Sequence, residues 1–165
     1  MRKLVLFMLG MILALAGFSV RAGGFDNRQG RWTLGAGGGV TVDPTMGAIQ
    51  AQVNYYVTDE VSFGPMAQYE FSGDDWAAGF SGQAKYSAIL ANNKVVRPYG
   101  QVGVGFLRYR VDRWDEDDTK TTYLFPVGGG FEFKLSDQLS LDANGIVNIS
   151  NHPFGGIFVG VQYIY

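Results

Sequence analysis

The chain has no cysteine, which excludes disulfide bonds and thiolate metal sites from its 165 residues. It has only 5 prolines, so a collagen-like or linker composition is excluded as well. A single histidine, His152, cannot form a metal site that needs several histidines. After residue 22, no apolar run reaches the roughly 18 residues that indicate a membrane-spanning helix. Stability must therefore come from a sheet or a packed core.

Residues 1–22 are predicted to be a cleavable signal peptide. Arg2 and Lys3 give a positive start, Leu4 to Phe18 form an apolar stretch, and Val20-Arg21-Ala22 offer a cleavage site. The apolar stretch, about 15 residues, is shorter than the roughly 20 needed to span a bilayer, which disfavours a retained anchor. Removing three of the 13 Lys and Arg residues leaves 10 against 15 acidic residues, a formal charge of −5. No basic patch for nucleic acid remains.

Hydrophobic residues make up 47% of the chain, and they alternate with polar residues almost throughout the region after residue 22. Ile49, Ala51 and Val53, for example, alternate with Gln50 and Gln52. A period of two is typical of β-strands with one apolar and one polar face. The pattern predicts eight strands, at residues 32–42, 48–57, 61–71, 76–90, 96–106, 122–135, 139–149 and 157–165.

The connections between these strands fall into two groups, which alternate along the chain. The tight turns are residues 58–60, 91–94 and 136–138. The connections on the opposite side include the two longest, and they are residues 43–46, 72–75, 112–120 and 150–156. Short turns on one side and longer loops on the other are typical of outer-membrane barrels. With an even number of strands, both termini are expected on the side of the tight turns, which is periplasmic in such barrels.

The two faces of the strands indicate a membrane protein. The polar face is mostly Gly, Ser, Gln and Asn, whereas the outer face of a soluble β-sandwich carries many charges. The apolar face has aromatic residues in two belts, which are typical of the two membrane interfaces. The belt near the turns comprises Tyr55, Phe63, Tyr86, Phe133 and Tyr163, and the belt near the loops comprises Tyr69, Phe71, Trp76, Phe106 and Tyr123.

A bilayer excludes free sheet edges, so the sheet is expected to close on itself. We therefore predict an all-β, eight-stranded antiparallel up-and-down transmembrane β-barrel over residues 30–165. It would be preceded by the signal-peptide helix, residues 1–22, and by an N-terminal periplasmic segment, residues 23–29.

Residues 97–106, Arg-Pro-Tyr-Gly-Gln-Val-Gly-Val-Gly-Phe, resemble the Pro-Tyr, Gly-x-Gly strand of the small outer-membrane β-barrel domain family, which includes OmpA-, OmpX- and OmpW-like barrels. The alternating residues Val159, Val161, Tyr163 and Tyr165 resemble the C-terminal signal by which the barrel-assembly machinery recognises its clients. The resemblance covers roughly residues 28–165. It implies a monomer in the outer membrane of a Gram-negative bacterium, in contact with lipid and lipopolysaccharide, which meets periplasmic chaperones during biogenesis.

Five charged residues are predicted to face the lumen near the turns: Lys85, Arg97, Glu132, Lys134 and Asp142. If the hairpin at residues 136–138 pairs Leu135 with Leu139, Glu132 lies opposite Asp142. Two like charges in that position need cations nearby, and Arg97 and Lys85 are the candidates. The pattern favours a salt-bridge network that fills the lumen. A narrow ion gate or a catalytic pair of carboxylates would be the functional alternatives.

The longest loop is acidic and contains Asp112, Asp115, Glu116, Asp117 and Asp118. A solvated outer loop is the simplest interpretation, and binding of a divalent cation is the alternative, although the spacing is not that of an EF-hand.

The resemblance also raises lipid A deacylation, because deacylases with this architecture have a His-x-Ser-Asn pattern on the penultimate strand. Here that position reads Asn148-Ile149-Ser150-Asn151, and Asn148 cannot accept the serine proton. We therefore expect no enzyme, no cofactor and no resident metal. A structural or surface-interaction role is favoured, with narrow-pore transport of small solutes as the alternative.

Overall fold

The computed structural model describes residues 28–88, 95–110 and 119–165. The predicted signal peptide and most of the predicted periplasmic segment lie outside these residues. The described part contains eight antiparallel strands: β1 (Trp32–Val42), β2 (Gly47–Tyr56), β3 (Val61–Ser72), β4 (Asp75–Ser87), β5 (Val96–Arg110), β6 (Lys120–Lys134), β7 (Leu139–Ile149) and β8 (Phe154–Ile164).

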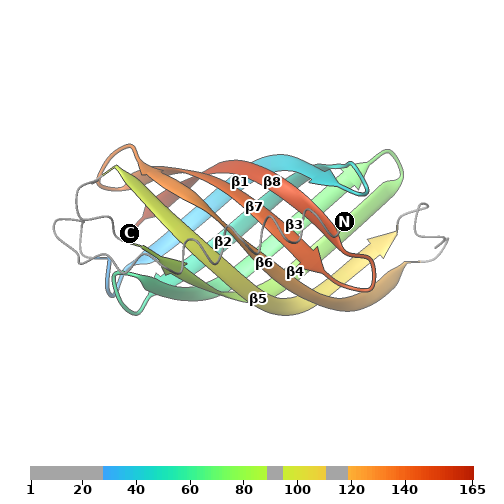
Figure 1. Ribbon diagram of the computed structural model, residues 1–165, viewed down its shortest axis with the longest axis horizontal. Helices are drawn as coiled ribbons and strands as arrows, with labels where there is room; N and C mark the ends of the chain where they lie inside the picture. The colour runs from blue at the N-terminus through green and yellow to red at the C-terminus, as the bar shows by residue number, and fades with distance from the viewer. Residues whose placement is uncertain (1–27, 89–94, 111–118) are drawn as a thin grey trace.

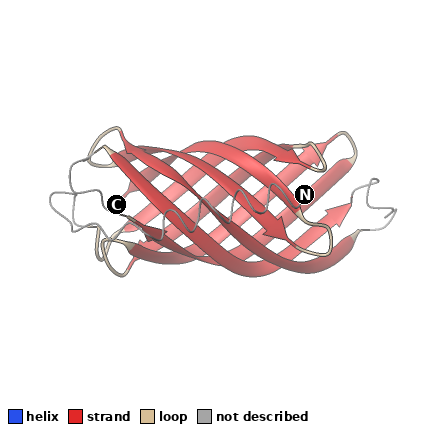
Figure 2. Ribbon diagram, viewed as in Figure 1, coloured by secondary structure: helices blue, strands red, loops and turns tan. Residues whose placement is uncertain are grey.

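Each strand pairs with its neighbour in the sequence, and β1 also pairs with β8, so the sheet closes into a barrel (Figure 1). Strands account for most of the described chain (Figure 2). No helix long and apolar enough to cross a membrane occurs among the described residues. The predicted eight-stranded up-and-down barrel is confirmed.

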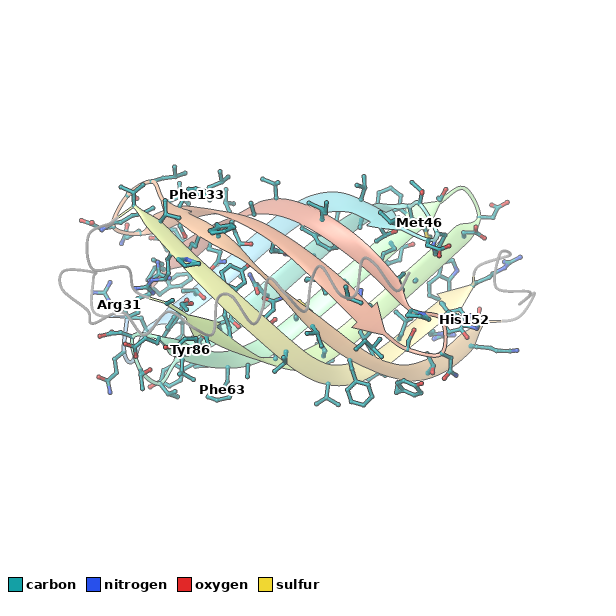
Figure 3. All side chains as sticks on the ribbon, viewed as in Figure 1. Arg31, Met46, Phe63, Tyr86, Phe133 and His152 are labelled. Carbon is teal, nitrogen blue, oxygen red and sulfur yellow. The ribbon has the colours of Figure 1, made fainter. Side chains whose placement is uncertain are left out.

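The two ends of the barrel differ in their connections. We call one the turn end, since it carries residues 57–60, residues 135–138 and the C-terminal Tyr165. The other is the loop end, which carries residues 43–46, 73–74 and 150–153. In Figure 3, Arg31, Phe63, Tyr86 and Phe133 lie toward the turn end, whereas Met46 and His152 lie toward the loop end.

The alternation of the sequence becomes an outer and an inner face of the barrel. Aromatic residues of both predicted belts point outward, and Phe63, Tyr86, Tyr69 and Phe106 remain exposed. Neighbouring outward rings also meet across strands, as Phe80 and Phe106 do with ring centres 5.9 Å apart. An apolar outer wall with aromatic residues near both ends matches the surface that a bilayer solvates.

The hairpin of β5 and β6 is longer than the sequence pattern predicts. The alternation predicts that β5 ends at Phe106, but the strand continues to Arg110, and β6 already begins at Lys120. The extension escapes the prediction because Arg108 and Arg110 occupy the outward positions where the alternation requires apolar residues.

Gly64 of β3 is required by the close approach of β2. A Cβ atom at Gly64 would overlap the carbonyl oxygen of Val53, whereas a Cβ at Gly82 of β4 would meet nothing within 4 Å. Because a backbone carbonyl cannot move away as a side-chain tip can, Gly64→Ala is expected to destabilise the barrel by about 1–3 kcal/mol. Gly82→Ala is the matched control and should be nearly neutral. Urea unfolding of the refolded proteins measures both, and equal unfolding curves would contradict the steric argument.

Candidate functional site: the barrel lumen

A tight turn lies just before β1. Arg31 N–H donates to the Arg28 carbonyl at 2.9 Å, and Gly30, with φ +79°, occupies the position that favours glycine in such a turn. The Asp59 carboxylate, in the turn between β2 and β3, accepts from the Arg28 N–H at 2.8 Å and from the Gln29 N–H at 3.1 Å. This turn holds the backbone of Arg28 at the mouth of the barrel.

The Arg28 side chain reaches inside and forms a two-pronged ion pair with Glu132 of β6. Its Nη2 donates to Glu132 Oε1 at 2.7 Å and its Nη1 to Oε2 at 2.9 Å. Ser140 Oγ donates to the same carboxylate at 2.6 Å, and Arg28 Nη1 also donates to Tyr56 Oη at 3.1 Å. Bidentate contacts of this kind are among the strongest that a buried carboxylate can form. The sequence did not suggest Arg28, because it precedes the first alternating segment.

A second ion pair joins Lys85 of β4 to Asp142 of β7. The Lys85 Nζ lies 3.6 Å from Asp142 Oδ2 and 3.5 Å from the centre of the Tyr99 ring. Asp142 also accepts hydrogen bonds from Tyr99 Oη at 2.8 Å, from Asn144 Nδ2 at 2.6 Å and from Gln162 Nε2 at 2.6 Å. A buried lysine is therefore held by one carboxylate and one aromatic face.

The two ion pairs are neighbours because Glu132 and Asp142 are directly opposite each other in the β6–β7 pairing, as the predicted hairpin requires. The predicted need for cations is met by Lys85 and by Arg28, rather than by Lys85 and Arg97. Arg97 is buried at the same end, where its Nη1 donates to the Asp59 carbonyl oxygen at 3.4 Å. We call Arg28, Lys85, Arg97, Glu132 and Asp142 the charged layer.

Lys134 was predicted to face the lumen, but it lies at the rim. Its side chain is 28% exposed, and its Nζ pairs at 2.8 Å with Asp137, which is 88% exposed, in the turn after β6. Lys134 occupies an inward position of β6, but the strand ends at this residue. Its side chain is therefore next to water and to the turn that follows.

Lys134→Ala is expected to change the free energy of unfolding by less than about 1 kcal/mol, because exposed ion pairs contribute little. Urea unfolding of the refolded variant would measure this. A loss as large as that of a buried charge would mean that Lys134 belongs to the charged layer after all.

Beyond the charged layer, the lumen contains amides and then large apolar side chains. Gln83 Nε2 donates to Gln52 Oε1 at 2.8 Å and to Asn54 Oδ1 at 3.1 Å. Toward the loop end follow two buried clusters, which together we call the apolar layer: Ala48, Met66, Ile146 and Phe158 in one, and Ala77, Leu107, Tyr109, Leu124 and Phe154 in the other. The alternation predicts a mostly small and polar inner face, and these large apolar side chains depart from it.

The described part of the lumen has almost no surface that water can reach. In the apolar layer Ile146 and Phe158 are 0% exposed, and in the charged layer Arg97 and Glu132 are similarly buried. Glu70 is also buried, and its neighbours across β2 and β4 are Ala48 and Ala77. The side chains therefore fill the interior, as is usual for barrels of eight strands.

Ser150 and His152, which the sequence singled out beside Asn148, belong to a local turn after β7. Ser150 Oγ donates to the His152 carbonyl at 2.7 Å and accepts from the His152 N–H at 3.2 Å. The His152 ring meets the Tyr109 ring edge-on, with centres 5.7 Å apart. The serine is thus engaged with the backbone of residue 152, a geometry that stabilises the turn.

The remaining predicted residues belong to the C-terminal strand and to the acidic loop. The C-terminal residues Val159, Val161, Tyr163 and Tyr165 all point outward at alternate positions, as the proposed assembly signal requires. The acidic loop residues Asp112, Asp115, Glu116, Asp117 and Asp118 lie outside the described residues.

Comparisons with known proteins agree with this architecture. A family model described as "Outer membrane protein beta-barrel domain" matches residues 7–163. The N-terminal β-barrel domain of Pseudomonas aeruginosa OprF superposes with a TM-score of 0.71 at 14% identity, covering 85% of this chain and all of that domain. Neisserial surface protein A gives 0.62 at 15% identity, covering 81% and 95%. The attachment invasion locus protein Ail of Yersinia pestis gives 0.57 at 14% identity, covering 83% and 99%. A search of curated protein sequences gave no significant match.

Proposed function

Because the chain belongs to the outer membrane protein β-barrel domain family, we propose that it is a closed barrel with a structural or surface-interaction role. The observation that carries this proposal is the filled lumen. A channel wide enough for solutes would leave inward side chains accessible to water, yet the large side chains of the charged and apolar layers are almost completely buried. The surfaces left for partners are then the loop end and the outer wall.

A current measurement tests the closed lumen. The protein refolded into planar bilayers should give no stepwise conductance above that of protein-free bilayers. A bilayer-spanning barrel with a known open channel, inserted under the same conditions, is the positive control. Reproducible single-channel steps from the wild-type chain would overturn the closed-barrel proposal and favour the narrow pore.

The proposal also includes an orientation, with the turn end in the periplasm and the loop end outside the cell. The short connections at the turn end and the even number of strands support it.

The absence of cysteine makes single-cysteine labelling a clean test of this orientation. Asp74→Cys places a thiol on an exposed connection at the loop end, and Gln138→Cys places one on an exposed turn at the other end. On intact cells, a membrane-impermeant maleimide should label only the Asp74→Cys protein, and both variants should react after lysis. Labelling of Gln138→Cys alone on intact cells would reverse the orientation.

A further inference from the structure

In the described strands, the outer wall of the barrel carries charge at a single place. Among the outward-facing positions of the eight described strands, only Arg108 and Arg110 are charged, and both lie at the loop end of β5. Every other charged residue of the strands alternates onto the inner face. A charged side chain on the lipid face costs about 2–4 kcal/mol at the middle of a bilayer and roughly 0–1 kcal/mol near its edge. The two arginines therefore lie at a depth where an outward charge is tolerated.

The surroundings of the arginines mark a membrane interface. One step closer to the barrel centre, Phe106 pairs across the sheet with Phe80 of β4 and Tyr123 of β6, and all three rings are exposed. Arg108 lies between Ala78 and Thr121 on the flanking strands, whose small side chains leave the guanidinium uncovered. Aromatic rings of this kind lie at headgroup level, so the arginines beyond them lie among the headgroups.

The two arginines place two positive charges side by side, which favours an anion as a partner. Positions two apart on one face of a strand lie about 7 Å apart, so the two positive charges repel each other. Neither side chain forms an ion pair with an acidic residue in the described part of the chain. Guanidinium groups bind phosphate through two parallel hydrogen bonds, which makes phosphate the favoured partner for both.

From these observations we propose that Arg108 and Arg110 bind the phosphate groups of lipopolysaccharide in the outer leaflet. The proposal rests on the orientation proposed above, because only that orientation places the loop end in the leaflet that contains this glycolipid. Two arginines at alternate positions of one strand suit a headgroup with more than one phosphate better than a phospholipid with one. The site would anchor the barrel in the outer leaflet through β5, one of the two strands of the longest hairpin.

Binding to purified glycolipid tests the proposal without depending on orientation or conductance. The mature protein refolded in zwitterionic detergent micelles is titrated with fluorescent lipopolysaccharide, either intact or enzymatically dephosphorylated. Wild-type protein should bind the intact form at least about tenfold more tightly, the scale expected for hydrogen bonds to a charged group. Arg108→Gln/Arg110→Gln should lose this preference. Arg31→Gln is the matched control, since Arg31 is exposed at the opposite end and contributes only its backbone to the recorded hydrogen bonds.

Four results would overturn the proposal. The double variant could bind intact glycolipid as wild type does, or Arg31→Gln could lose the preference equally, which would indicate non-specific attraction to cations. Phosphatidylglycerol in the same micelles could show an equal dependence on Arg108 and Arg110, which would make any anionic phospholipid the partner. If the cysteine-labelling test instead placed the loop end in the periplasm, the arginines would lie in the inner leaflet. The glycolipid would then be excluded as their partner, even if the protein bound it in micelles.

Discussion

Replacing Asp142 with alanine is expected to lower the free energy of unfolding by about 3–5 kcal/mol, the cost of leaving one partner of a buried ion pair alone. The Lys85 side chain is 0% exposed, so water does not solvate its ammonium group at the surface. Glu132 is nearby, but Arg28 and Ser140 already occupy its carboxylate. The Tyr99 hydroxyl would lose its acceptor as well. Urea unfolding of the refolded barrel, followed by tryptophan fluorescence, measures the change.

Two further variants separate the buried charge from a general loss of packing. Asp137→Ala removes the same side chain from an exposed turn and should cost less than about 1 kcal/mol. Lys85→Met combined with Asp142→Ala removes both charges and should recover part of the stability, because no lone charge remains buried. If Asp142→Ala does not refold, the recovery in the double variant still tests the argument. Equal effects of Asp142→Ala and Asp137→Ala would contradict it.

The fold could be predicted because a barrel in a membrane needs the same alternation in every strand. Residues such as Ile49 and Val53 face outward at every second position, and the tight hairpin after β6 is enough to predict Glu132 opposite Asp142, as the strand pairing confirms. The register of a hairpin follows from its turn, so contacts between adjacent strands are within reach of sequence reasoning.

Contacts across the lumen were out of reach, because alternation gives the face of a residue but not its partner on a distant strand. Tyr99 of β5 meets Asp142 of β7, and the pair is 43 residues apart. Arg28 lies before the first strand, where no periodicity operates, and a turn held by Asp59 directs it inward. The apolar layer was also missed, since Leu124 and Phe158 face inward and meet apolar partners from other strands only after the barrel closes.

The charged and apolar layers lie one after the other along the lumen, and this arrangement predicts how a current would respond to substitutions. Two barriers in series add their resistances to ion flow, so removing one layer leaves the other layer to block the current. Arg28→Ser/Glu132→Ser removes both partners of one ion pair, and Leu124→Ala/Phe158→Ala thins both apolar clusters. Each double variant alone should remain silent in planar bilayers.

Only the combination of all four substitutions is expected to conduct. The matched control is a quadruple variant that carries Phe106→Ala in place of Phe158→Ala. It loses an aromatic ring from the outer wall rather than from the lumen, and it should carry no current. Because each Phe→Ala can cost about 3–5 kcal/mol in a packed interior, folding of every variant must be checked by its cooperative unfolding. Conductance in either double variant alone would show that a single layer closes the barrel. A quadruple variant that folds but carries no current would mean that the remaining inward side chains, such as Tyr99 and Lys85, are a sufficient barrier.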